Sequence, residues 1–448
     1  MDIKTKIKSG GMRISRRQFL ESVSAATVFH IVPSKVLGKR APSNTLNIAG
    51  IGAGGRGSDN MDALSVAEQN IVALCDVDWE RAARTFGKFP KAKRYKDFRV
   101  MLEKEKNIDA VVVSAPDHIH AAASMMAIKM GKHVYCEKPL THTVSEARTL
   151  ARAAKEHKVA TQMGNHGQAS EGTRRLAEYI WGGAIGQVRK VDAWTDRALG
   201  WWPQGIDRPV DTPPVPETLA WDLWLGPAPY RPYHPAYLPF VWRGWIDFGT
   251  GALGDMACHI FDPIFRALKL GHPISVEATS TRMNDETYPL ASIVTYRFPA
   301  LGEMPPTQLT WYDGGLKPPR PVELERERMH VSNGTIFYGD GGVMYENRIV
   351  PETKMQAFDP PPKILPRSPG HYEEWIEACK GGKPAESDFE FVAFLTEVVL
   401  LGNVALRMNR LDNETGVKLY WNPADMEFTN MPEANQYLHH VYRDGWSL

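Results

Sequence analysis

Residues 46–57 read LNIAGIGAGGRG, a short apolar run that leads directly into the pattern G-x-G-x-x-G. The run has no helical periodicity and is typical of a buried strand. The glycines that follow permit a tight turn, let a pyrophosphate approach the backbone, and let the next helix pack on the strand. We therefore expect a dinucleotide at this loop, at the N-terminus of a helix. The loop residues expected to bind it are Gly52, Gly54, Gly55, Arg56 and Gly57.

A second apolar run, residues 71–76, ends in Asp76, 24 positions after the first glycine of the loop. This is close to the spacing at which an acidic side chain reaches the hydroxyls of the adenosine ribose. A carboxylate there would repel a 2′-phosphate, so the sequence favours NAD. NADP remains the alternative because Arg56 and Arg81 are near in sequence.

Strand and helix patterns alternate farther along the chain. Strands are expected at residues 109–114, 133–136 and 159–163, and helices at 121–130 and 145–157. This alternation is typical of βαβ units. It predicts an α/β fold whose first domain, residues 43–166, is a doubly wound parallel Rossmann sheet.

Four further motifs make the sequence resemble the Gfo/Idh/MocA oxidoreductases, the family of glucose–fructose oxidoreductase and inositol dehydrogenase. They are Ser114-Ala115-Pro116-Asp117-His118-Ile119-His120, Glu137-Lys138-Pro139-Leu140, Gly254-Asp255-Met256-Ala257-Cys258-His259 and residues 375–384. The resemblance implies a second, α+β domain, residues 167–448, in which helices cover one side of an open, largely antiparallel sheet. It also implies further cofactor contacts from Ser114, Pro116, His120, Glu137, Lys138 and Asn165.

The resemblance implies Lys138, Asp255 and His259 as the catalytic set. Oxidising a secondary alcohol requires a base for the hydroxyl proton and an aligned hydride acceptor. Asp255 and His259 stand at i and i+4, so on a helix they share a face, and the carboxylate is expected to raise the imidazole pKa. His259 is the preferred base, with Lys138 as competitor. Alternatively, Asp255 and His259 form an ordinary contact on a helix surface. Their spacing would also suit a metal ion, but the sequence offers no evident third ligand.

Seven of the 13 tryptophans lie within residues 194–245, and ten prolines lie between Pro203 and Pro239. We interpret this segment as an insertion that covers or lines the substrate cleft, because indole faces stack on sugar rings. The alternative is that its aromatic residues give an irregular loop its own small core. The residues predicted to contact substrate are His166, Arg197, Trp201, Trp202 and Trp245.

The leading functional prediction is an NAD(P)-dependent oxidoreductase acting on a secondary hydroxyl of a sugar, glycoside or cyclitol. The alternative is a redox-assisted glycoside hydrolase that recycles its cofactor. A non-catalytic nucleotide sensor is disfavoured because Lys138, Asp255 and His259 are all present. The bond Lys138–Pro139 is predicted to be cis, which would aim the lysine into the cleft.

Residues 15–20, SRRQFL, match a twin-arginine export pattern, with a short apolar run after them. We therefore expect residues 1–42 to be a leader for the twin-arginine translocase, and the protein to be periplasmic or otherwise exported. If the leader is not used, the location is cytoplasmic. Because free NAD is scarce outside the cytoplasm, we expect a tightly bound cofactor.

The charges nearly cancel, with 53 Lys and Arg against 52 Asp and Glu and a formal net charge of +1. This balance leaves no large excess of positive charge, which is the feature expected of a protein that binds nucleic acid or an anionic membrane. The four cysteines form no CxxC pair, which argues against a zinc knuckle, an iron–sulfur site or a disulfide framework. A homo-oligomer is expected, with the exposed sheet face as a plausible contact surface.

Overall fold

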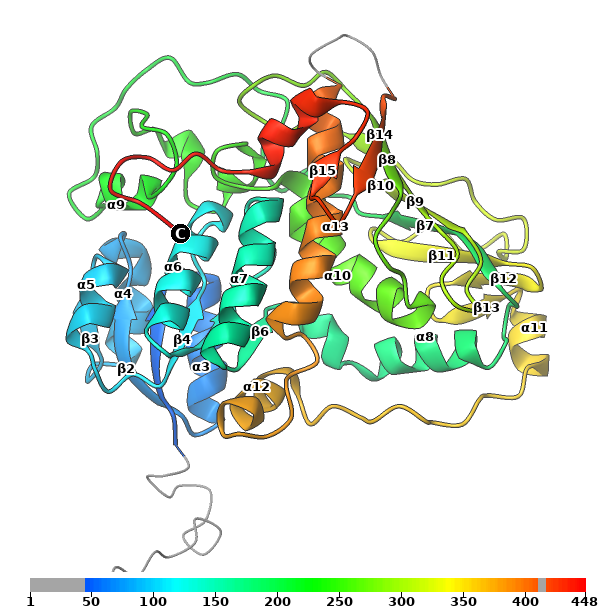
Figure 1. Cartoon of the computed structure of the whole chain (residues 1–448), viewed down its shortest axis with the longest axis horizontal. Helices are drawn as coiled ribbons and strands as arrows, with labels where there is room; N and C mark the ends of the chain where they lie inside the picture. The colour runs from blue at the N-terminus through cyan, green and yellow to red at the C-terminus, as the bar shows by residue number, and fades with distance from the viewer. Residues whose placement is uncertain (1–44, 410–415) are drawn as a thin grey trace, which may run out of the picture. The chain divides into compact units, whose positions relative to one another are not determined.

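The computed structural model describes residues 45–409 and 416–448 (Figure 1). The predicted leader, residues 1–42, lies outside the described residues. Residues Leu46–Leu448 form one compact unit, and the division at residue 166 stays a prediction.

The first half of this unit is a six-stranded, all-parallel sheet in the order β3-β2-β1-β4-β5-β6. Its strands are β1 (Asn47–Ile51), β2 (Asn70–Cys75), β3 (Lys93–Tyr95), β4 (Ala110–Val113), β5 (His133–Cys136) and β6 (Thr161–Met163). Its helices are α3 (Arg56–Val66), α4 (Trp79–Lys88), α5 (Phe98–Lys104), α6 (Asp117–Lys129) and α7 (Val144–His157). The strand order reverses between β1 and β4, which opens a crevice at the carboxyl ends of the strands. The predicted doubly wound sheet is confirmed.

The second half is a nine-stranded sheet in the order β13-β12-β11-β7-β10-β9-β8-β14-β15. Its strands are β7 (Val188–Trp194), β8 (Ser275–Ser280), β9 (Ser292–Phe298), β10 (Thr307–Tyr312), β11 (Gly334–Gly339), β12 (Gly342–Tyr345), β13 (Arg348–Val350), β14 (Lys418–Asn422) and β15 (Glu427–Phe428). Only β7 and β10 pair in parallel; the other neighbours are antiparallel. The predicted, largely antiparallel second sheet is also confirmed.

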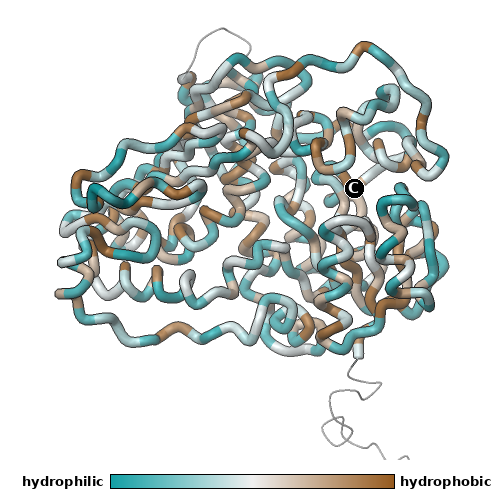
Figure 2. The backbone as a smooth tube through the Cα atoms, turned by 180° about the vertical axis from the view of Figure 1, so that it is seen from behind, coloured by the Kyte–Doolittle hydropathy of each residue, from teal (hydrophilic) through white to brown (hydrophobic). Residues whose placement is uncertain are grey.

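Helices and short 3₁₀ turns complete the second half. They are η2 (His166–Ala169), α8 (Glu171–Trp181), α9 (Trp221–Leu225), η3 (Pro235–Tyr237), η4 (Val241–Gly244), α10 (Gly251–Leu268), α11 (Glu352–Ala357), α12 (His371–Cys379), α13 (Phe389–Met408) and η5 (Pro432–Leu438). Helices α8, α10 and α13 lie together beside the large sheet (Figure 1). Along the outer loops, hydrophilic positions separate the apolar ones (Figure 2), as expected for segments that run over a surface.

The alternation of side chains along each Rossmann strand supplies two apolar layers. On one face Ile48, Leu74 and Val112 pack with Trp375 of α12, which the chain contributes from its second half. On the other face Val111 packs among the residues of a core that continues into α10 and α13. The first sheet is thus completed by a helix more than 200 residues downstream.

Among the described residues, α13 alone is long and apolar enough to cross a membrane, with a mean hydropathy of 1.8. Of its apolar window, 83% is buried inside the protein. The helix therefore has the character of a core element.

Candidate active site

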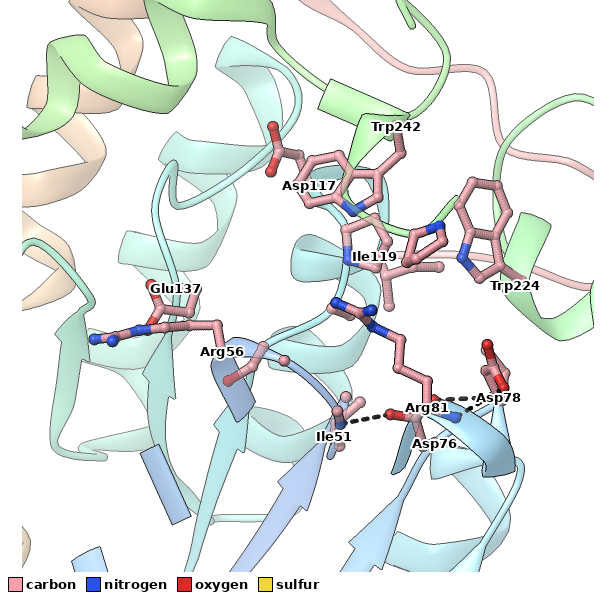
Figure 3. A pocket seen from close by; sticks show the side chains of 18 of the residues that line it. Ile51, Arg56, Asp76, Asp78, Arg81, Asp117, Ile119, Glu137, Trp224 and Trp242 are labelled. Carbon is pink, nitrogen blue, oxygen red and sulfur yellow. Dashed lines mark hydrogen bonds and ion pairs between the residues drawn. The ribbon is translucent and has the colours of Figure 1, made fainter. Parts of the chain in front are cut away.

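A cavity of about 720 Å³ lies at the carboxyl ends of the parallel strands, with side chains of the second half on its other side (Figure 3). This is within the range of about 300–1,000 Å³ typical of small-molecule sites. Of the predicted site residues, it is lined by Gly52, Gly54, Gly55, Arg56, Asp76, Ser114, Pro116, Glu137, Lys138, His166 and His259. The structure therefore brings the two halves of the predicted site together.

The glycine loop has no room for side chains at two of its motif positions. A Cβ on Gly52, whose φ is +81°, would lie 2.5 Å from the carbonyl oxygen of Ser114. A Cβ on Gly57 would lie 1.7 Å from the carbonyl oxygen of Gly52. Helix α3 begins directly after Gly55, with no side chain capping its first turn. The N–H groups of Gly57 and Ser58 donate to the carbonyls of Gly54 and Gly55 at 3.1 and 3.0 Å. The positive end of the helix dipole and the narrow loop fit a pyrophosphate.

Asp76 lies at the end of β2, on the wall of the cavity (Figure 3). Its two oxygens accept hydrogen bonds from the backbone N–H groups of Gly54 and Asp78, each at 2.9 Å. Burial raises the pKa of this carboxyl to about 6, against the opposing effect of those two bonds. Arg81 of α4 also lines the cavity and approaches Gly55. The carboxyl group of Asp76 and the guanidinium of Arg81 thus both line the cavity where the ribose hydroxyls are predicted to lie.

Glu137 is the centre of a polar network behind the glycine loop. Its Oε1 accepts from Arg56 Nε at 3.1 Å and from Asn60 Nδ2 at 2.9 Å, and the same amide also reaches Ser114 Oγ at 2.9 Å. Burial would raise the pKa of Glu137, but Arg56 and Asn60 outweigh it and lower the pKa. The guanidinium of Arg56 lies beside Glu137 (Figure 3) and also contacts the ring of His166.

Lys138 and Asp255 form a closely paired contact between the two halves of the site. Lys138 Nζ donates to Asp255 Oδ1 at 2.6 Å and to the Asp255 carbonyl at 2.8 Å. The same Oδ1 accepts from Arg243 Nε at 3.0 Å. Although burial opposes ionisation, the two cations hold the Asp255 pKa well below its ordinary value. The predicted cis bond at Lys138–Pro139 is confirmed.

His259 follows Asp255 by one turn of α10, but the expected effect on its pKa is wrong. Burial is the largest influence and Lys138 the next, and together they lower the His259 pKa to about 4 despite the nearby carboxylate. Oδ1 of Asp255 accepts hydrogen bonds from Lys138 and Arg243. The ring is therefore neutral at pH 7, which is the form a proton acceptor needs.

His120 does not line the cavity but lies behind it, between two of its loops. Its Nδ1 lies 2.8 Å from the Pro139 carbonyl, and its Nε2 lies 2.8 Å from the Ala115 carbonyl. Because both neighbours are acceptors, only the doubly protonated ring satisfies both contacts. Burial by itself would lower the His120 pKa, but Cys136, Asp117 and the Pro139 carbonyl raise it to about 10.

Asn165 is also buried away from the cavity. Its side-chain amide donates to Asp262 Oδ2 at 2.5 Å, which ties the end of β6 to α10. The neighbouring His166 does line the cavity, and Tyr135 Oη lies 3.0 Å from its Nε2.

Residues of the Trp/Pro-rich segment lie both in a small apolar core and in the lining of the cavity. Trp221, Trp224 and Trp245 pack into a small apolar core with Tyr237 and Phe248, which is the alternative interpretation. The residues of this segment that line the cavity are Leu223, Trp224, Leu238, Pro239, Phe240, Trp242 and Arg243. Trp224 and Trp242 lie across the cavity from the strand ends (Figure 3).

Four predicted substrate residues lie outside this cavity lining. Trp245 is fully buried in the segment's own core, where its Nε1 donates to the Ala236 carbonyl at 2.8 Å. Trp202 is buried in a small cluster with Ala198. Arg197 stacks on the exposed ring of Trp201, with its guanidinium carbon 3.3 Å from the ring centroid.

The cavity lining includes residues that the sequence analysis missed. Lys96, Asp97 and Phe98 follow the short strand β3, Arg243 lies in η4, and Trp446 lies near the end of the sequence. Arg243 could have been found from its place among the aromatic residues 240–245, since cations often stack on such rings.

The fold and site define a two-part dinucleotide-binding protein, and comparison with known families agrees. Residues 46–165 match the family model described as "Oxidoreductase family, NAD-binding Rossmann fold", and residues 187–300 match "Oxidoreductase family, C-terminal alpha/beta domain". Together they cover more than half of the chain, which belongs to the Gfo/Idh/MocA oxidoreductase family.

Two curated relatives illustrate the similarity. Inositol 2-dehydrogenase of Salmonella paratyphi B is 31% identical over 151 residues, 33% of this chain and 45% of the relative. The 1,5-anhydro-D-fructose reductase of Ensifer adhaerens is 36% identical over 164 residues, 36% of this chain and 38% of the relative. The chain thus aligns with less than half the length of these relatives.

A solved structure extends the likeness across both halves. The WlbA dehydrogenase of Bordetella pertussis, in complex with NADH and UDP-GlcNAcA, superposes with a TM-score of 0.59 at 16% identity. The match covers 84% of this chain and 99% of that one. At this identity, the likeness supports the fold alone.

Proposed function

We propose that the protein is an NAD-dependent oxidoreductase that transfers a hydride between the cofactor and a secondary hydroxyl of a sugar, glycoside or cyclitol. The observation that supports it most is the meeting of Lys138 and His259 in the cavity that the glycine loop also lines. The relatives named above are a cyclitol dehydrogenase and a sugar reductase. These relatives are a dehydrogenase and a reductase, and the hydrolytic alternative is not proposed.

The proposed roles follow from charge and position. A nicotinamide bound along the strand ends would supply the hydride acceptor. Lys138, held by Asp255, places a positive charge where an alkoxide would develop and so stabilises it. His259 is neutral at pH 7 and accepts the hydroxyl proton. Lys138 is the competing base, because it lines the same cavity.

The preference for NAD over NADP rests on Asp76. A 2′-phosphate placed on this residue would face a buried carboxyl group whose oxygens accept only backbone N–H groups. Arg81 is the residue that would favour NADP. We propose that the carboxylate dominates, because it stands directly at the strand end where the ribose is expected.

The aromatic wall opposite the strands suits a carbohydrate. Trp224, Phe240 and Trp242 present large flat rings to the cavity, and apolar faces of sugar rings stack on such surfaces. The polar groups Lys138, Arg243 and His259 supply donors and acceptors for sugar hydroxyls. This combination of apolar rings and few polar groups is typical of specific small-molecule sites.

We further propose that residues 1–42 direct export to the periplasm and that the cofactor is retained through many turnovers. Outside the cytoplasm a freely exchanging cofactor would be lost, so retention requires an affinity toward nanomolar, about −12 kcal/mol. Purified protein should then contain NAD(H) and turn over without added nucleotide. Apo-protein that works only with added, freely exchanging NAD would contradict this proposal.

The activity is tested with the purified protein and a panel of sugars, glycosides and cyclitols, following the nicotinamide absorbance and identifying products by mass spectrometry. An oxidised or reduced sugar supports the proposal, and a freed aglycone with unchanged cofactor contradicts it. Lys138→Met serves as the control that separates site chemistry from contaminating activity.

A further inference from the structure

Residues 439–448 cross from the second half of the chain to the Rossmann helices, where they end beside α6 (Figure 1, red). Tyr442 Oη donates to Glu146 Oε1 on α7 at 2.6 Å. Lys129 at the end of α6 donates to the Leu448 carbonyl at 3.2 Å. This tail is therefore fixed to the Rossmann half at two separate points.

Arg443 fixes the same tail to the Trp/Pro-rich segment. Its guanidinium donates to Asp222 Oδ1 at 2.5 Å, to the Asp222 carbonyl at 2.9 Å and to the Gly226 carbonyl at 3.1 Å. These acceptors lie within and directly after α9, whose Trp224 lines the cavity. One side chain thus holds the tail against the element that forms the opposite wall.

Trp446 is the tail residue that reaches the cavity. Its ring centroid lies 5.9 Å from that of Phe98, and the guanidinium carbon of Arg99 lies 4.4 Å from its centroid. Arg99 is in turn held by Asp97, with contacts of 2.7–3.1 Å. Trp446, Phe98 and Asp97 all line the cavity, so the indole is part of its wall and lies at the end of β3.

The end of β3 is the place where an adenine ring is expected. Asp76 ends β2, the strand next to β3, and an acid at that position holds the adenosine ribose. The glycine loop at the end of β1 fixes the pyrophosphate on the other side of the ribose. A base attached to that ribose therefore extends toward Lys96, Asp97 and Phe98, where Trp446 lies.

We propose that Trp446 forms the outer wall of the adenine site and slows release of the dinucleotide. This inference rests on the proposed function, since it assumes that a dinucleotide occupies the cavity. The tail supplies the covering element that a retained cofactor requires, in addition to the glycine loop. Because Trp446 is partly exposed and held mainly through Phe98 and Arg99, its removal leaves the core of the fold intact.

The test compares Trp446→Ala and Trp446→Phe with wild type and with Trp181→Ala. Trp181 is a matched control, because its indole is 38% exposed and lies outside the cavity lining. Binding of NADH, ADP-ribose and nicotinamide mononucleotide is measured by calorimetry, and release of bound NADH by fluorescence with excess unlabelled NAD. Stacking of a base on an aromatic ring has a typical effect of about tenfold on affinity.

We expect Trp446→Ala to weaken NADH and ADP-ribose about tenfold, through faster release, and to leave nicotinamide mononucleotide unchanged. Trp446→Phe should recover most of the affinity, and Trp181→Ala should match wild type. Arg443→Ala removes the side chain that holds the tail to α9 and keeps the indole, so it should weaken ADP-ribose binding in the same direction, by a smaller factor.

Unchanged ADP-ribose affinity in Trp446→Ala would overturn the inference while leaving the proposed function standing. Equal weakening of ADP-ribose and the mononucleotide would also overturn it, because that pattern indicates a general structural effect. Failure of the wild type to bind any of the three would instead overturn the proposed function.

Discussion

Lys138 Nζ lies 2.6 Å from Asp255 Oδ1, and this contact joins the end of β5 to the first turns of α10. Both side chains are largely buried, with 14% and 11% of their surfaces exposed. A lysine in such a pair has a fixed position, unlike a surface lysine, because the partner carboxylate is itself held by Arg243. The geometry therefore pre-positions a cation in the wall of the cavity.

Replacing Lys138 with Met should lower kcat by about two to four orders of magnitude, the usual scale for acid–base and electrostatic groups. The NAD affinity should change little, because the glycine loop and Asp76 are untouched. Steady-state kinetics and calorimetry on the same preparation separate the two effects. Near-normal turnover by both Lys138→Met and His259→Asn would contradict the catalytic assignment.

The pH dependence of kcat/KM should reflect the low pKa of His259. Burial and Lys138 lower it from its ordinary value of 6.5 to about 4, so the ring stays neutral on acidification well below pH 6.5. The rate is therefore expected to remain flat between pH 8 and about 5. An acid limb centred near pH 6.5 that disappears in His259→Asn would show that the base has an ordinary pKa.

His120 should stabilise the fold at neutral pH and lose that contribution in base. Its folded pKa of about 10 exceeds the ordinary 6.5, so the folded state binds the proton more tightly. The contribution is complete below pH 6.5 and is lost as the pH rises toward 10. Urea unfolding of wild type and His120→Gln at pH 6 and pH 9 measures it. The difference in stability should be larger at pH 6 than at pH 9.

Replacing Asp76 with Ser should shift cofactor preference toward NADP, because the carboxyl that opposes a 2′-phosphate is removed while Arg81 remains. The ratio of kcat/KM values for NADP and NAD gives the shift. Tighter binding of NADP than NAD by the wild type would contradict the cofactor assignment and make Arg81 the phosphate partner.

Two neighbouring tryptophans should give opposite phenotypes. Trp245→Ala empties a fully buried position and should destabilise the protein by about 3–5 kcal/mol. Trp242 lines the cavity and is only partly buried, so Trp242→Ala should raise the substrate KM with little change in stability. Denaturant unfolding and kinetics on both variants test this. Equal loss of stability in both would place Trp242 in the core as well.

The sequence predicts the parts of the site that depend on local patterns. The glycine loop, Asp76 and the motif at Lys138 are read from short spacings, and the alternation of strands and helices places them at one sheet edge. Strand β3 was missed because Lys93–Tyr95 is short and polar, as edge strands often are. No period or spacing relates it to Trp446, about 350 positions downstream, so their contact depends on tertiary packing alone. The pKa of His259 was mispredicted because burial cannot be read from i,i+4 spacing.

The buried position of Trp375 affects how the chain can be divided into fragments. The residue is fully buried between α12 and the first sheet, where it packs with Ile48 and Tyr135. A gene fragment that stops near residue 166 would lack this indole and would expose the apolar face that it covers. We therefore expect such a fragment to be less stable than the same residues in the whole chain.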